Sequence, residues 1–164
     1  MRHIKATEEI VLGIDEYAIF LGGSIEMNTA EKWQDRLARE LSHCNDNLVL
    51  LNPRRDDWDS SWVQDPTPGT QFHKQVTWEL DYQDDADICV YYFDPSTKSP
   101  ITLLELGCYG CLNPDIVVVC CPTSFWRYGN VAMFCARHNI TLVHSFDELV
   151  NELKEWLPPD VIGN

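Results

Sequence analysis

A single carboxylate stands in an otherwise uncharged stretch of the chain. Between Lys98 and Asp115 the only charged residue is Glu105. Ser99 and Pro100 precede it and are typical of the N-cap and first position of a helix. We expect the apolar residues at helical spacing around Glu105 to form the buried face: Ile101, Leu103, Leu104, Leu106, Cys108 and Cys111. Glu105 would then be partly buried in the second turn, as a catalytic carboxylate often is. The alternative is a surface glutamate on the polar edge of the helix.

A pair of glycines follows an apolar run that predicts a central strand. Residues 17–21 are that run, and Gly22, Gly23 and Ser24 come directly after it. Glycines between a strand and a helix let backbone N–H groups approach a ligand closely. The alternative is a tight turn. The dinucleotide fingerprint is incomplete here, and the phosphate loop of nucleotide triphosphatases is absent.

The longest irregular segment lies between residues 52 and 69. It contains Asp57 and Trp58, and we expect it to cover a ligand, with tryptophan available to stack on a planar base. The alternative is a surface loop pinned by its own aromatic residues. Arg54 and Arg55 in the same segment either receive a 5′-phosphate or pair with neighbouring aspartates.

Apolar runs alternate with helical patterns along the whole chain. The predicted strands are 17–21, 47–51, 88–93, 115–120 and 140–144; the helices are 28–41, 72–84, one beginning at 99–100, one ending near 138 and one capped by Ser145. This alternation predicts one domain over 1–164 with a flavodoxin-like, doubly wound α/β fold of about five parallel strands and helices on both faces. In the strand order 2-1-3-4-5, the ends of the first and third strands form the ligand crevice.

Composition excludes several classes of partner. The 164 residues carry 12 Lys+Arg and 26 Asp+Glu, a net charge of −14, which disfavours nucleic acid polymers and anionic membranes. No leader pattern or membrane-length apolar run is present, so we expect a cytoplasmic protein. Seven cysteines, most of them in apolar patterns, fit a reducing compartment. Cys108 and Cys111 have a spacing used by metal sites, but we expect no metal.

Several sequence blocks resemble the nucleoside 2-deoxyribosyltransferase family. The blocks are Phe20–Ile25, Asn52–Trp58, Trp78–Leu80, Leu103–Gly107 and Phe125–Val131. Jointly they span about residues 17 to 145. The resemblance implies exchange of the base of 2′-deoxynucleosides, with free purine or pyrimidine bases as acceptors and without a cofactor.

The resemblance also implies roles for individual residues. Glu105 matches the family's nucleophile, Glu79 its ribose-binding acid and Asn130 an asparagine that can reach a neighbouring subunit, so a homo-oligomer is implied. Two positions depart from the pattern. Phe20 replaces a tyrosine on the first strand, and Ser99 replaces a base-contacting acid, which leaves Asp57, Trp58 or Asp94 for base recognition.

Two other functions remain open. Water could accept the sugar, which would make the chain a deoxynucleoside or deoxynucleotide N-glycosidase. The domain could also be a non-catalytic nucleotide-binding module, because a fold does not fix a function. A buried Glu105 would have no evident role in such a module.

Overall fold

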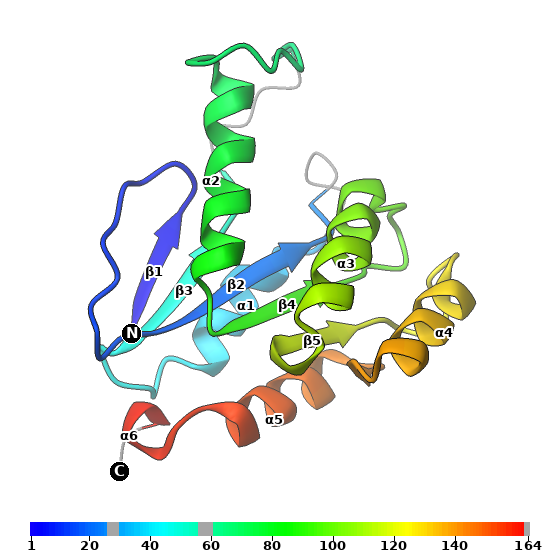
Figure 1. The fold of residues 1–164 in the computed structure, drawn as a ribbon. Coiled ribbons are helices and arrows are strands. Elements are labelled where there is room, and N and C mark those ends of the chain that lie inside the picture. The colour runs from blue at the N-terminus through cyan, green and yellow to red at the C-terminus, as the bar shows by residue number, and fades with distance from the viewer. Residues whose placement is uncertain (26–29, 56–60, 163–164) are drawn as a thin grey trace.

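The computed structural model describes residues 1–25, 30–55 and 61–162, and its centre is an all-parallel sheet (Figure 1). Six strands form it: β1 (Arg2–Lys5), β2 (Tyr17–Gly23), β3 (Leu48–Asn52), β4 (Ile88–Tyr92), β5 (Val117–Cys120) and β6 (Thr141–Val143). Their order is β1-β3-β2-β4-β5-β6, so removal of β1 leaves the predicted order 2-1-3-4-5. The doubly wound α/β fold is therefore confirmed, with one strand more than predicted. The extra strand pairs only with β3 at the sheet edge.

Helices cover both faces of the sheet. They are α1 (Trp33–Glu40), α2 (Gln71–Asp85), α3 (Pro100–Leu112), α4 (Tyr128–His138), α5 (Phe146–Trp156) and the short α6 (Pro159–Ile162). One core packs α1, α5 and α6 against strand residues such as Leu21 and Val90. The other packs α2, α3 and α4 against the opposite face, with Phe20 and Tyr91. No helix in the described part of the chain is long and apolar enough to span a membrane.

Two helices begin differently from the prediction. Helix α1 starts at Trp33, after Lys32, which makes no side-chain cap; Asn28, the predicted start, lies outside the described residues. Ser99 precedes α3 in the left-handed conformation, with φ 47°, and its hydroxyl does not cap the helix. Ser145 does cap α5, because its Oγ accepts from the N–H of Glu148 at 3.2 Å.

The buried face of α3 is not the predicted one. Thr102, Leu106, Tyr109 and Gly110 face the core, whereas much of the predicted apolar face is exposed: Ile101, Leu104, Cys108 and Cys111. Nearly every residue of α3 is apolar, so periodicity in the sequence could not select the inward side. The hydroxyl of Tyr109 contacts α2 instead, where it donates to the carboxylate of Asp84.

The centre of the sheet brings two chain ends together. Strands β2 and β4 are neighbours, with Gly22 paired to Tyr91 and Gly23 to Tyr92. The chain leaves β2 toward α1 on one face and leaves β4 toward α3 on the other (Figure 1). This is the switch point of a doubly wound sheet, where ligands bind in such folds.

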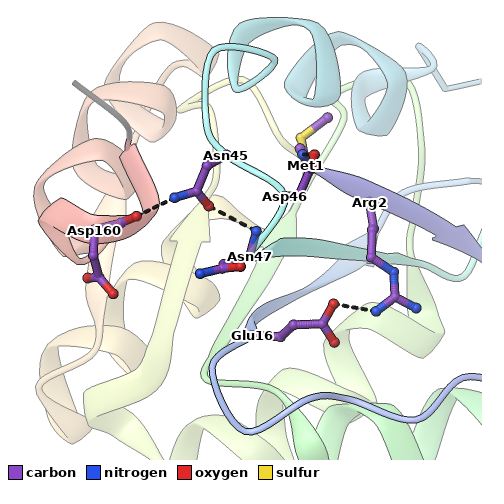
Figure 2. Close-up of polar contacts among 7 residues, drawn as sticks. All are labelled: Met1, Arg2, Glu16, Asn45, Asp46, Asn47 and Asp160. Atoms are coloured by element: carbon purple, nitrogen blue, oxygen red, sulfur yellow. Dashed lines mark hydrogen bonds and ion pairs between the residues drawn. The ribbon is translucent and has the colours of Figure 1, made fainter.

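Polar contacts fix the opposite end of the sheet. Figure 2 shows Asn45 joining two segments: its amide donates to the carbonyl of Asp160 in α6, and its Oδ1 accepts from the N–H of Asn47 at 2.9 Å. Arg2 of β1 pairs with Glu16, just before β2. These contacts anchor the amino ends of the strands and leave the carboxyl ends to the candidate site.

Candidate functional site

Glu105 lies in the second turn of α3 with its side chain partly buried. One carboxylate oxygen, Oε1, accepts a hydrogen bond from Nε2 of Gln83 on α2 at 3.3 Å. The side chain of Glu105 lies over the core on the α2–α3 face of the sheet, which includes Tyr91 and Cys89 of β4. Glu105 is thus held on the α2–α3 side of the sheet, above β4.

Glu79 supplies a second carboxylate from α2. Its Oε1 accepts from Nε2 of Gln75, one helical turn earlier, at 2.8 Å. The same nitrogen donates to the carbonyl of Pro53 at 2.9 Å, which ties α2 to the segment after β3. Thr70 caps the helix by accepting from the N–H of His73 at 3.1 Å. The position of Glu79 is therefore set by the helix and by Gln75.

Burial perturbs both carboxyl groups, and Glu105 also responds to the charge of Glu79. Burial and the charge of Glu79 raise the pKa of Glu105 to about 8, against a lowering effect of the Gln83 hydrogen bond. Burial raises the pKa of Glu79 to about 7, and the Gln75 hydrogen bond opposes it. Near neutral pH, therefore, the pair retains protons that exposed carboxyl groups would have lost. Such an acid–base pair can supply a nucleophile and hold a proton beside it.

Gly22 and Gly23 are the last two residues of β2 and do not follow the strand as predicted, and packing explains both. A Cβ on Gly22 would lie 3.0 Å from the ring of Tyr91. Gly23 has φ +151°, and a Cβ there would lie 2.5 Å from the carbonyl oxygen of Tyr92. Ser24 follows, and its N–H donates to that same carbonyl at 2.8 Å. These contacts account for both glycines, and their approach to a ligand stays a prediction.

Three buried hydroxyl groups meet at the carboxyl ends of β2 and β4. Oγ1 of Thr97 donates to Oγ of Ser24 at 2.9 Å, and Ser99 lies within hydrogen-bond distance of both. The N–H of Asp94 also donates to Oγ of Ser24, at 2.8 Å. This network explains the left-handed backbone of Ser99, because its hydroxyl points into the cluster instead of along the helix.

Both carboxylate oxygens of Asp94 accept hydrogen bonds from nearby loop residues. Oδ1 accepts from the N–H and the hydroxyl of Ser96, and Oδ2 accepts from the N–H of Glu31 at 3.2 Å. Burial acts to raise the pKa of Asp94, but these hydrogen bonds outweigh it and hold the pKa below the usual range. Asp94 therefore links two loops around the switch point, and a contact to a base stays a prediction.

The remaining predicted residues lie in other segments of the chain. Asp57 and Trp58 lie outside the described residues. Asn130 is exposed in the first turn of α4. Arg54 is buried and donates to the carbonyl oxygens of Glu31, at 3.0 Å, and Ala30, at 3.5 Å, so it ties the segments after β2 and β3 together.

Three residues of the site were not predicted: Gln75, Gln83 and Tyr91. Gln75, Glu79 and Gln83 recur every four residues, which places them on one face of α2. That spacing was a usable signal in the sequence. Tyr91 had none, because its place beneath α2 follows from the pairing of β4 with β2.

A hollow on the protein surface lies elsewhere along α2. It is lined partly by Glu9, His73, Asp81 and Asp85, and neither Glu79 nor Glu105 lines it. Among the described residues, no group of three or more histidine, cysteine, aspartate or glutamate side chains could hold a metal ion.

Comparison with known families agrees with the sequence blocks. The family described as Nucleoside 2-deoxyribosyltransferase like matches residues 16–125, more than half of the chain. The chain belongs to this family. The match includes Glu79 and Glu105, whereas Asn130 lies beyond its end. No curated protein matches the chain.

Proposed function

We propose that the chain is a nucleoside 2-deoxyribosyltransferase that exchanges the base of 2′-deoxynucleosides through a covalent 2-deoxyribosyl–Glu105 intermediate. Family membership supports the class of reaction. The observation that carries the assignment is the partly buried carboxylate of Glu105, held by Gln83 and perturbed by the neighbouring carboxylate of Glu79. A side chain with no chemical role would gain nothing from this environment.

The reaction is a retaining glycosyl transfer in two steps. In the first step, a carboxylate oxygen of Glu105 bonds to C1′ and the bond from C1′ to the base nitrogen breaks. The electron pair of that bond leaves with the base, which takes up a proton from solvent. In the second step, a nitrogen of another base attacks C1′, loses its proton to solvent and releases the Glu105 carboxylate. Two inversions give a product with the original configuration.

Glu79 orients the sugar by hydrogen bonds to its hydroxyl groups. Orientation of C1′ against a fixed carboxylate supplies several kcal/mol of the barrier reduction in reactions of this kind, on the order of 7. The missing 2′-hydroxyl favours the deoxy sugar, because a hydroxyl there would withdraw electrons from the oxocarbenium-like transition state.

The protein acts as a homo-oligomer in the cytoplasm. Large apolar side chains are exposed on two neighbouring helices: Leu104 of α3 is 69% exposed, and Met133 of α4 is 75% exposed. Exposed apolar groups that gather on one surface are typical of subunit contacts. Asn130 on α4 would then lie near a second copy of the chain. The seven cysteines are free, as a reducing compartment requires.

The oligomer is tested by the molar mass in solution. Leu104→Asp should lower the mass measured by light scattering, because a charge in an apolar contact is costly to bury. Glu155→Gln on the exposed side of α5 should leave the mass unchanged. An unaltered mass for Leu104→Asp would remove α3 from the contact.

Base exchange is tested by chromatography of thymidine or deoxyuridine incubated with and without adenine, beside Glu105→Ala. A new deoxynucleoside that requires adenine and is absent with the variant is the expected result. Free base and deoxyribose without exchange would indicate an N-glycosidase. No turnover of several deoxynucleosides and deoxynucleotides would indicate a binding module.

A further inference from the structure

The side-chain amide of Gln83 is completely buried between two residues of the site. Its Nε2 donates to Oε1 of Glu105 at 3.3 Å and to the main-chain carbonyl of Glu79 at 3.1 Å. Its Oε1 accepts from the hydroxyl of Tyr91 at 2.7 Å. Both N–H groups and the oxygen are thus engaged, which leaves the amide a single orientation.

The directions of these hydrogen bonds follow from the chemistry of the partners. The Glu79 carbonyl can only accept, so the nitrogen of Gln83 must face it. The oxygen of Gln83 can only accept, so Tyr91 must donate. Burial raises the pKa of Tyr91 well above its ordinary value, so this phenol keeps its proton at any working pH. The chain of donors therefore runs from Tyr91 through Gln83 to the carboxylate of Glu105.

The fold gives this phenol its place. Tyr91 of β4 pairs with Gly22 of β2, and a Cβ on Gly22 would lie 3.0 Å from the Tyr91 ring. Cys89, on the same face of β4, donates its thiol to the main-chain carbonyl of Gln83 at 3.6 Å. Phe20 of β2 has no hydroxyl group. The hydroxyl nearest in the network is that of Tyr91 on the neighbouring strand β4, and it is linked to Glu105 through the side-chain amide of Gln83.

We propose that Gln83 is a positioning residue for Glu105, and that Tyr91 fixes Gln83 in the orientation that presents an N–H to the carboxylate. This inference rests on the proposed function. With Oε1 held by the amide, Oε2 accepts no hydrogen bond from any described residue and is the oxygen left to attack C1′. Without the Tyr91 hydroxyl, only the Glu79 carbonyl still holds the Gln83 amide in this orientation, so the amide is fixed less firmly and its N–H stabilises the ionised form of Glu105 less.

Other titratable groups around Glu105 remain the same in a test of Tyr91. Glu79 from α2 and Cys89 from β4 act on or respond to Glu105, and Asp84 from α2 with Cys108 and Tyr109 from α3 face Cys89 or Tyr91. Tyr91→Phe removes one hydroxyl and keeps the ring. The matched control is Tyr92→Phe, since Tyr92 is the next residue of β4 and its ring packs against Trp33 on the other face.

Two readouts follow. The first is the titration of the Glu105 carboxyl group by NMR of protein labelled with [13C]glutamate, without substrate, with the signal assigned by its loss in Glu105→Gln. We expect Tyr91→Phe to raise the pKa of Glu105 by about one unit. The second is the rate of exchange. At pH 7 the same shift lowers the ionised fraction and kcat about tenfold, with little change in KM, and the loss shrinks as the pH rises above 8.

Tyr92→Phe should change neither readout. An unaltered titration of Glu105 in Tyr91→Phe, or an equal shift in both variants, would overturn the proposal. If Tyr91→Phe does not fold, Gln83→Met removes the amide itself and must raise the same pKa. The NMR titration needs no turnover, so a wild-type protein without activity would refute the proposed function and still decide the role of Gln83.

Discussion

The ionised form of Glu105 should destabilise the folded protein. Glu105→Gln should therefore stabilise the fold at high pH, where the wild-type carboxyl group is ionised. The carboxyl group has a pKa of about 8 in the folded protein and an ordinary value of 4.5. A carboxyl group whose pKa is raised on folding favours the folded state fully below the unfolded pKa. That contribution is lost as the pH rises through the folded pKa.

The size of the stabilisation by Glu105→Gln can be worked out from the change in stability between pH 6 and pH 9. Between pH 6 and pH 9 the unfolded state is ionised throughout, while the folded state loses its proton near pH 8. The cost of ionising Glu105 in the folded protein therefore grows over about two pH units, which is about 3 kcal/mol. The neutral glutamine avoids this cost. Its stabilising effect should increase by about 2–3 kcal/mol from pH 6 to pH 9.

Urea unfolding followed by tryptophan fluorescence measures the difference. Work at pH 6 and above keeps the protein away from its isoelectric point near 4.5, where solubility is lowest. Glu155→Gln makes the same replacement at an exposed glutamate of α5 and is the control. A difference between Glu105→Gln and wild type that stays constant from pH 6 to pH 9 would refute the reasoning.

Two further predictions concern the same part of the structure. Glu79→Gln removes the charge that helps to raise the pKa of Glu105, so the rise of exchange activity with pH should move to lower pH; an unmoved pH profile of kcat would contradict this coupling. Gly23→Ala places a Cβ 2.5 Å from a carbonyl oxygen at positive φ and should destabilise the protein by about 3 kcal/mol or more in urea unfolding. Gly69→Ala, also at positive φ but with nothing within 4 Å of the new Cβ, should cost less; equal losses would mean that strain alone is responsible.

The fold could be predicted because its central strands are apolar runs. Residues 117–120 are Val, Val, Val and Cys, all buried, and such runs are typical of parallel strands covered on both faces. Strand β1 was missed because it has only four residues, of which only Ile4 is buried. Its pairing with β3 joins segments almost fifty residues apart, which no local pattern reports.

Only those parts of the site that depend on the sequence of a single helix could be predicted. Glu105 was predicted from its isolation in an apolar stretch, and Glu79 was assigned a role from the resemblance to the family. The link from Tyr91 through Gln83 depends on the register between β2 and β4 and on the packing of α2 against α3. The inward side of α3 could not be predicted, because a helix that is apolar all around has no polar face to orient it.

The most direct test of the central claim is capture of the covalent intermediate. Protein incubated with thymidine and no acceptor base is quenched in acid, digested and measured by mass spectrometry. We predict an added 2-deoxyribosyl group on the peptide that contains Glu105, its absence in Glu105→Gln, and its loss when adenine is added before quenching. Base exchange that proceeds with this peptide unmodified, or with the sugar attached to another residue, would contradict Glu105 as the nucleophile.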